Sequence, residues 1–194
     1  MIQLTDIDKE ILLSIARKTL KNALNLDQFN LSETVVPEKL MENGASFVTL
    51  TIDDRLRGCI GALSAYQPLV QDVCEHVLAA AFEDPRFPPL TAGEESLVKI
   101  EISYLTPPER LDYVTPQDLL DILVPGRDGL ILSDGYRRAT YLPQVWEQLP
   151  VKEDFLGSLC QKMGARRNLW RDKKLEVETY RAIHFSEEEF FQTP

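Results

Sequence analysis

The sequence predicts an α+β fold in which two hairpin-plus-helix repeats pack into one compact body, with an extra N-terminal helix and a C-terminal strand. Apolar residues alternate at every second position in some segments and recur every third or fourth position in others, so both strands and helices are expected. Each half of the chain has an apolar strand, an Asp-containing turn, an Arg-bearing return strand and a Cys-bearing helix in that order. No linker rich in proline, glycine or serine separates the halves, which predicts a single domain over residues 1–194.

The first predicted element is an amphipathic helix that begins after Thr5. Asp8 follows Thr5 at the spacing of a capping box, and apolar residues recur at helical spacing from Ile7 to Leu20. A polar connector over residues 25–34 then leads to Pro37.

A β-hairpin is predicted next, with residues 47–52 and 56–61 as its strands and residues 53–55 as a three-residue loop. This loop matches the apolar faces of the two strands by pairing Ile52 with Leu56, Leu50 with Gly58, and Val48 with Ile60. Arg57 and Cys59 then share the opposite face of the hairpin.

Pro68 is predicted to open a helix that ends at Glu83, because three prolines follow within residues 85–89 and make that segment a rigid loop. Residues 98–105 alternate as a strand.

The second half repeats the pattern. The expected elements are a capped helix over residues 115–124, a hairpin over 129–141 with an Asp134-Gly135 turn, a helical stretch from 142, a helix that Gly164 stops, a final strand over 175–185 and an acidic aromatic tail.

The composition is that of a globular protein with an acidic surface. Hydrophobic residues make up 44% of the 194 residues, and 31 acidic against 21 basic side chains give a formal net charge of −10. Such a surface repels phosphate backbones on average, which argues against a general nucleic-acid-binding protein.

The three cysteines, Cys59, Cys74 and Cys160, cannot all pair and form no Cys-x-x-Cys motif, which is typical of a reducing compartment. Neither a secretory leader nor a membrane-spanning apolar run is visible, so a cytoplasmic location without membrane association is expected.

Standard enzyme motifs are absent from the sequence: it has no glycine-rich phosphate loop, no His-Glu-x-x-His and no Gly-x-Ser-x-Gly. No Cys or carboxylate cluster with metal-ligand spacing stands beside His76 or His184. We therefore expect no metal and no cofactor, and interpret both histidines as ordinary helix or strand residues.

The segment Leu56-Arg57-Gly58-Cys59-Ile60-Gly61 is the most unusual in the chain. Glycines beside a cysteine in a strand allow a backbone or a ligand to approach closely, and Arg57 could hold an anion and lower the pKa of a nearby thiol. This pattern predicts a catalytic Cys59 with Arg57 and Gly58 in a substrate-binding site. The alternative is a small buried cysteine beside a structural salt bridge.

Further substrate-binding candidates are Asp84 and Arg86 in the proline-rich loop, and Arg138, which occupies in the second hairpin the place of Arg57 in the first. Arg57 and Arg138 could line one electropositive cleft for a small anionic substrate. The alternative for the loop is a turn that fixes the end of a helix.

A basic segment over residues 162–174 carries the best argument for nucleic-acid binding. It contains six basic residues and one acid, with an aromatic among them. The candidate contacts there are Arg166, Arg167, Trp170 and Arg171. The alternative is a solvated helix end with cations near its C-terminus.

Several segments resemble the AMMECR-type domain, also called AmmeMemoRadiSam system protein A. They are residues 44–50, 56–61, 80–90, 102–105, 126–130 and 139–146. The resemblance implies a compact α+β fold with two repeated units and a cleft between sub-domains. It also implies a pathway shared with a Memo-like protein and a radical-SAM protein.

These observations lead to three hypotheses, and the first combined with the third is favoured: a cytosolic component of a small modification pathway. The first is a component that binds or acts on a small or RNA-borne anionic substrate near Arg57, Gly58 and Cys59. The second is a non-catalytic module that binds nucleic acid through residues 162–174. The third, which comes from the resemblance, is an interaction partner of Memo-like and radical-SAM proteins. Whether the protein is an enzyme stays open at this point.

Overall fold

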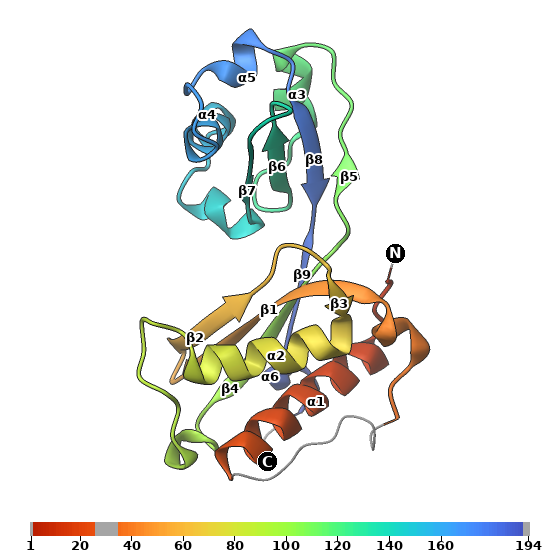
Figure 1. The fold of residues 1–194 in the computed structure, drawn as a ribbon, viewed down its shortest axis with the longest axis vertical. Coiled ribbons are helices and arrows are strands. Elements are labelled where there is room, and N and C mark those ends of the chain that lie inside the picture. Colours follow the sequence, from red (N-terminus) through yellow and green to blue (C-terminus); the bar gives the residue numbers. More distant parts are fainter. Residues whose placement is uncertain (1, 26–34, 192–194) are drawn as a thin grey trace. The chain divides into compact units, whose positions relative to one another are not determined.

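The computed structural model describes residues 2–25 and 35–191, and it confirms the predicted α+β class. Most of the predicted polar connector lies outside the described residues. The chain divides into two compact units, residues 1–106 with 183–194, and residues 107–182 (Figure 1). Each unit is described by itself here, and the single domain and the cleft between sub-domains stay predictions.

Unit 1 is a sheet with the strand order β2-β1-β4-β9, and β3 pairs with the start of β1. Helices α1 and α2 lie side by side against this sheet (Figure 1). The elements are α1 (Asp6–Leu24), η2 (Glu38–Met41), β1 (Asn43–Ile52), β2 (Arg55–Gly61), β3 (Gln67–Pro68), α2 (Leu69–Phe82), η3 (Ala92–Glu94), β4 (Lys99–Leu105), β9 (Ala182–Ser186) and α6 (Glu187–Phe190).

The core of unit 1 follows from the two periodicities in the sequence. Alternate residues in the middle of β1 and in β4 are apolar and buried, and these side chains pack with the apolar stripes of the two long helices. They include Val48, Leu50, Ile100 and Ile102 from the strands, and Leu12, Leu13, Val73 and Val77 from the helices. The predicted capping box starts α1, since the Thr5 hydroxyl accepts from the Asp8 N–H and the Asp8 carboxylate accepts from the Thr5 N–H.

Unit 2 is a second sheet with the strand order β5-β8-β6-β7. Its core packs around Trp146, whose ring stacks on Phe155 at a centroid distance of 3.6 Å. The elements are β5 (Glu109–Arg110), α3 (Pro116–Ile122), β6 (Gly129–Ser133), β7 (Arg138–Tyr141), η4 (Pro143–Glu147), α4 (Lys152–Lys162), α5 (Leu169–Asp172) and β8 (Glu176–Tyr180). A hairpin followed by a helix therefore occurs in each unit, as predicted.

The first hairpin departs from the predicted loop. Its turn has two residues, Asp53 and Asp54, which both take left-handed φ values of 50° and 58°. A two-residue turn of this kind matches the twist of the strands, whereas a three-residue loop does not need two left-handed residues. The register is restored by a bulge at Arg57, so that Leu50 still pairs with Gly58 and Val48 with Ile60, while Leu56 lies opposite Thr51 instead of Ile52.

The predicted final strand over residues 175–185 is wrong as one element. It is two strands, β8 and β9, because β8 pairs with β6 in the second sheet and β9 pairs with β4 in the first. Alternation along the sequence is the same for both, so only the pairing partners reveal the break.

Candidate functional site

The cysteine-bearing strand β2 is pressed against helix α2 at Gly58. A Cβ atom at Gly58 would lie 2.0 Å from the backbone oxygen of Ala80, so no side chain fits there. The close approach predicted for this glycine is therefore to the protein's own helix. Because side chains alternate along a strand, Cys59 points to the face of the sheet opposite the helix.

The peptide group of Cys59 is held from both sides by the proline-rich loop. Its N–H donates to Asp84 Oδ2 at 2.9 Å, and its carbonyl accepts from Arg86 Nη2 at 3.3 Å. The structure thus brings together three of the residues selected from the sequence: Cys59, Asp84 and Arg86.

The Asp84 carboxylate is the centre of this arrangement. Its side chain is 2% exposed, and it accepts from Nε and Nη2 of Arg86 at 2.9 and 2.7 Å and from the Arg86 backbone N–H at 3.1 Å. The Arg86 guanidinium holds the pKa of Asp84 well below its usual range, against the opposing effect of burial. Asp84 is therefore a fixed negative charge that ties the loop to β2.

Arg86 keeps part of its hydrogen-bonding capacity. A guanidinium has five N–H groups, and the bonds of Arg86 to Asp84 and to the Cys59 carbonyl use Nε and Nη2. Within the described residues, no hydrogen bond uses its Nη1, and the side chain is 53% exposed. Arg86 can therefore donate to an anion near Cys59.

Arg57 is hydrogen-bonded to groups of the protein itself. Its side chain is 12% exposed, and its Nε donates to Glu94 Oε1 at 2.8 Å. Nη1 and Nη2 donate to the carbonyls of Pro88 and Pro89. This hydrogen bonding by Arg57 lowers the pKa of Glu94 to about 2. The arrangement corresponds to the structural alternative for Arg57, an anchor for the 84–94 segment, and Arg57 as an anion ligand stays a prediction.

The Cys59 thiol is half-buried and lies beside the Thr49 hydroxyl, with Oγ1 and Sγ 3.4 Å apart. The backbone register pairs Cys59 with Thr49, as predicted by the alternation, and pairs Thr49 with Glu101 on the next strand. Three polar side chains therefore form one row across β2, β1 and β4 on the face away from α2.

His184 extends this face, although the sequence suggested an ordinary strand histidine. Its Nδ1 lies 2.8 Å from Ser103 Oγ and 3.8 Å from Glu101 Oε1. Ser103 is buried, whereas the His184 and Glu101 side chains are 42% and 47% exposed. Both neighbours lie at Nδ1, so the group is not a serine–histidine–carboxylate relay. Only the pairing of β4 with β9 reveals this cluster, since 81 positions separate Ser103 from His184.

Arg138 belongs to unit 2, where its Nη2 donates to Glu178 Oε2 at 2.7 Å. Its side chain is 60% exposed. The site that it was predicted to share with Arg57 stays a prediction.

The aromatic residue of the basic segment 162–174 is not available for stacking on a base. Trp170 is 2% exposed and belongs to the core of unit 2, so its ring has no free face on which a base could stack. Its predicted stacking role is wrong because the ring is buried in apolar contacts, and the guanidinium of Arg171 lies over it at 4.7 Å. Arg166 pairs with Asp172, and Arg167 pairs with Asp154.

The other two cysteines differ from Cys59. Cys160 is fully buried and Cys74 is half-buried, and burial raises the pKa of both thiols. Over residues 2–25 and 35–191, no three His, Cys, Asp or Glu side chains are grouped so that they could hold a metal ion. Among the helices of these same ranges, none has the length and apolar character needed to cross a membrane.

Comparisons with known proteins agree with one another. The AMMECR1 family model matches residues 13–185. A protein of Saccharolobus islandicus is 36% identical over 196 residues, which cover 96% of this chain and 86% of the relative. A protein of Methanopyrus kandleri is 36% identical over 195 residues, with 96% and 92% covered. The crystal structure of an uncharacterized protein from Pyrococcus horikoshii matches with a TM-score of 0.78 and 32% identity, covering 96% of this chain and 95% of that one.

Proposed function

The chain belongs to the AMMECR1 family, and from its site geometry we propose that it binds a small anionic substrate beside Cys59 and reacts with it through the thiol. In this reaction the thiolate attacks an electrophilic carbon of the substrate. A bond between sulfur and that carbon forms, the bond from the carbon to its leaving group breaks, and the leaving group takes up the proton that the thiol has released. The observation that carries this proposal is the double clamp on the Cys59 peptide group by Asp84 and Arg86. The clamp fixes the peptide group of Cys59 next to a guanidinium that still has N–H groups to donate.

The chemistry of such a site starts from the thiolate, which is the nucleophilic form of cysteine. The Thr49 hydroxyl lies within reach of Sγ and can donate to the thiolate. Arg86 can at the same time hold a carboxylate or phosphate of the substrate. Holding both reacting groups in place lowers the entropic part of the barrier.

Proton transfer is the proposed task of Glu101 and His184. Neighbouring strands lie about 4.8 Å apart, so Cys59 and Glu101, two strands apart in one row, are separated by roughly 10 Å. This distance is too long for Glu101 to deprotonate Cys59 directly. A substrate that lies across the row can contact the thiol at one end and the carboxylate or imidazole at the other.

The thiol proposal is tested by the charge preference of Cys59 labelling. The native protein is treated with anionic 2-sulfonatoethyl methanethiosulfonate or with the cationic trimethylammonium analogue, and the modified cysteines are identified by peptide mass spectrometry. We expect Cys59 to react before Cys160. We also expect Arg86→Gln to lower the anionic-to-cationic rate ratio by about 25-fold. One unit charge at about 4 Å in water is worth about 1 kcal/mol, or about fivefold in rate, and its loss slows the anionic reagent and speeds the cationic one.

Arg55→Gln is the matched control, because Arg55 is an exposed cation on the same strand and has no ion pair in the described part of the chain. It should leave the rate ratio unchanged. Arg138→Gln measures the predicted contribution of Arg138 in the same way. The proposal fails if Cys59 reacts no faster than Cys160, or if Arg86→Gln and Arg55→Gln change the ratio equally.

The family resemblance also supports a place in a pathway with a Memo-like protein and a radical-SAM protein, and a cytoplasmic location fits the absence of disulfides among the described cysteines. Purified proteins from one organism should bind one another at micromolar concentration in calorimetry. If calorimetry detects no heat of binding at that concentration, the proteins do not form a physical complex and this part of the proposal is wrong. The proposal about the Cys59 thiol is not affected by that result.

A further inference from the structure

Unit 1 contains a cavity of about 600 Å³ whose lining shares no residue with the Cys59 site. This volume is within the range of small-molecule sites. Its walls come from the second half of α1, the segment that leads into β4, and α6. The lining residues are Ser14, Arg17, Lys18, Lys21, Ser96, Leu97, Val98, Lys99, Glu187, Glu188 and Phe191.

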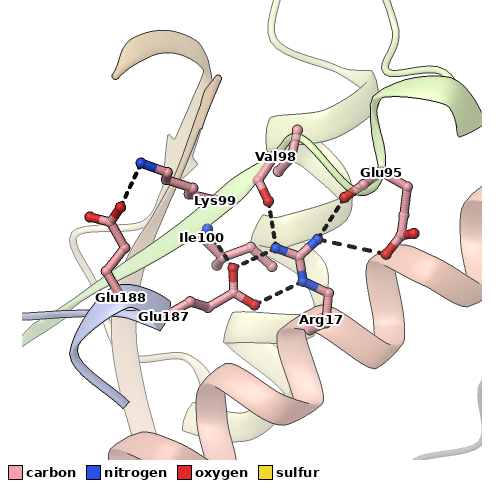
Figure 2. Close-up of polar contacts among 7 residues, drawn as sticks. All are labelled: Arg17, Glu95, Val98, Lys99, Ile100, Glu187 and Glu188. Atoms are coloured by element: carbon pink, nitrogen blue, oxygen red, sulfur yellow. Dashed lines mark hydrogen bonds and ion pairs between the residues drawn. The ribbon is translucent and has the colours of Figure 1, made fainter. Parts of the chain in front are cut away.

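Arg17 is one of the residues that line this cavity. Figure 2 shows its hydrogen bonds and ion pairs with the neighbouring segments. Its Nε donates to Glu187 Oε1 at 2.8 Å, and its terminal nitrogens donate to the carbonyls of Glu95 and Val98 at 2.9 and 2.6 Å. Glu187 also accepts from the Ile100 N–H at 2.9 Å. These bonds join α1, β4 and α6, and they make Arg17 a fixed part of the wall with its charge already neutralised.

Lys99 is neutralised as well, since its ammonium pairs with Glu188 and with Asp54 (Figure 2 shows the first pair). Lys18 and Lys21 are different. They are exposed, lie on one side of α1 at i,i+3 spacing, and form no ion pair with any other residue that the structure describes. The cavity therefore has an excess of positive charge on its α1 side, on a protein whose formal net charge is −10.

The same cavity is lined by exposed apolar side chains. Leu97 is 56% exposed and Phe191 is 38% exposed, and both line it together with Val98. A ligand that covers them removes apolar surface from water, which is the main favourable term in binding.

We propose that this cavity binds an amphipathic anion, namely an apolar chain or ring that carries one carboxylate or phosphate. The apolar part of the ligand covers Leu97 and Phe191, and its anionic end lies at Lys18 and Lys21. Charge complementarity selects the anion, because the acids among the described lining residues, Glu187 and Glu188, are already paired. The inference is independent of the function proposed for Cys59.

Isothermal titration of the full chain with decanoate tests this site. We expect saturable binding of one decanoate, with acetate and decanol both much weaker because each lacks one half of the ligand. Decyl phosphate distinguishes the two anionic groups, and binding of either anion supports the site.

Two variants with an equal change in net charge distinguish binding of decanoate at the cavity from attraction by the net charge of the whole protein. Lys18→Gln with Lys21→Gln should raise the Kd for decanoate by about tenfold, since two nearby charges are lost. Arg55→Glu changes the net charge by the same −2 away from the cavity lining and should leave the Kd within about twofold. Leu97→Ser, at an exposed position, should weaken binding without changing the fold.

The proposal is overturned if the native protein shows no saturable binding of decanoate or decyl phosphate at millimolar concentration. Equal effects of the lysine double variant and of Arg55→Glu also overturn it, because the binding is then not at this cavity. Circular dichroism of each variant confirms that the fold is unchanged.

Discussion

Replacement of Asp84 by alanine is expected to destabilise unit 1 and to release the peptide group of Cys59. The Asp84 carboxylate accepts from the Cys59 N–H at 2.9 Å and from the Arg86 N–H at 3.1 Å, and the residue is 4% exposed. A buried donor left without its acceptor costs about 1–3 kcal/mol, and hydrogen bonds to a charged group contribute about 1.5–3 kcal/mol each.

The contribution of the Arg86 ion pair must be discounted, because its guanidinium is 53% exposed and such pairs contribute at most about 1 kcal/mol. The Arg86 N–H is on an exposed residue and can bind water in the variant. The loss is therefore dominated by the Cys59 N–H, and we expect Asp84→Ala to lower the free energy of unfolding by about 2–4 kcal/mol.

Urea unfolding followed by two signals measures this loss. Both tryptophans of the chain, Trp146 and Trp170, belong to unit 2, so their fluorescence reports that unit, while far-ultraviolet circular dichroism reports both. Asp84→Ala should shift the dichroism transition to lower urea and increase the labelling rate of Cys59. Asp134→Ala is the matched control, because Asp134 binds Arg137 in a similar way in unit 2.

The same variant changes the response to acid. The pKa of Asp84 is lower in the folded chain than its unfolded value of about 3.9, so its stabilising contribution is complete above that value and is lost as the pH falls below it. Asp84→Ala should therefore unfold with a weaker dependence on pH below about pH 4. A loss of stability under about 0.5 kcal/mol with an unchanged acid profile would refute the clamp, since surface substitutions alone produce changes of that size.

Three further outcomes follow from the structure. Gly58→Ala should cost about 1–3 kcal/mol or more, because its Cβ would overlap the Ala80 carbonyl, whereas Gly93→Ala meets no atom within 4 Å and should be neutral by urea unfolding. The ion pair of Glu94 with Arg57 stabilises the native chain fully above about pH 4.5, and this stability is lost as the pH falls towards 2. Glu94→Gln should remove it, which an acid titration followed by circular dichroism detects. An unchanged titration would contradict a stabilising ion pair between Arg57 and Glu94. Trp170→Ala removes a buried core side chain and should lower the free energy of unfolding by about 3–5 kcal/mol, measured by thermal unfolding. A variant with full stability and weakened RNA binding would instead support Trp170 as an exposed residue that stacks on a base.

Local patterns accounted for much of the fold. The capping boxes at Thr5 and Thr115, the left-handed Gly164 after α4, and the period-two strands β1 and β4 all appear where their spacing predicted them. Each of these signals depends on residues within a few positions of one another, so a single sequence is sufficient to find them.

The site was predictable only in part. The pairing of Cys59 with Thr49 followed from the alternation of side chains along the strands. Asp84 and Arg86 were selected for their residue types. Their hydrogen bonds to the Cys59 peptide group could not be predicted, because these bonds depend on how a loop folds back over a strand. The interpretation of Arg57 as an anion ligand did not consider its hydrogen bond to Glu94, because Glu94 lies 37 positions later in the chain. His184 looked unremarkable because its partners come from another strand.

The sequence by itself determined the family, the class of fold and the hairpin that carries Cys59, because these depend on residue order and local periodicity. Only the tertiary structure decided which charges remain free to bind a ligand. Arg57 and Arg17 donate hydrogen bonds to carboxylates and carbonyls far along the chain, and Trp170 is buried. Arg86, Lys18 and Lys21 can still donate to an anion. The physical reason is that a charge is neutralised by its neighbours in space, and neighbours in space are set by the packing of segments that are distant in sequence.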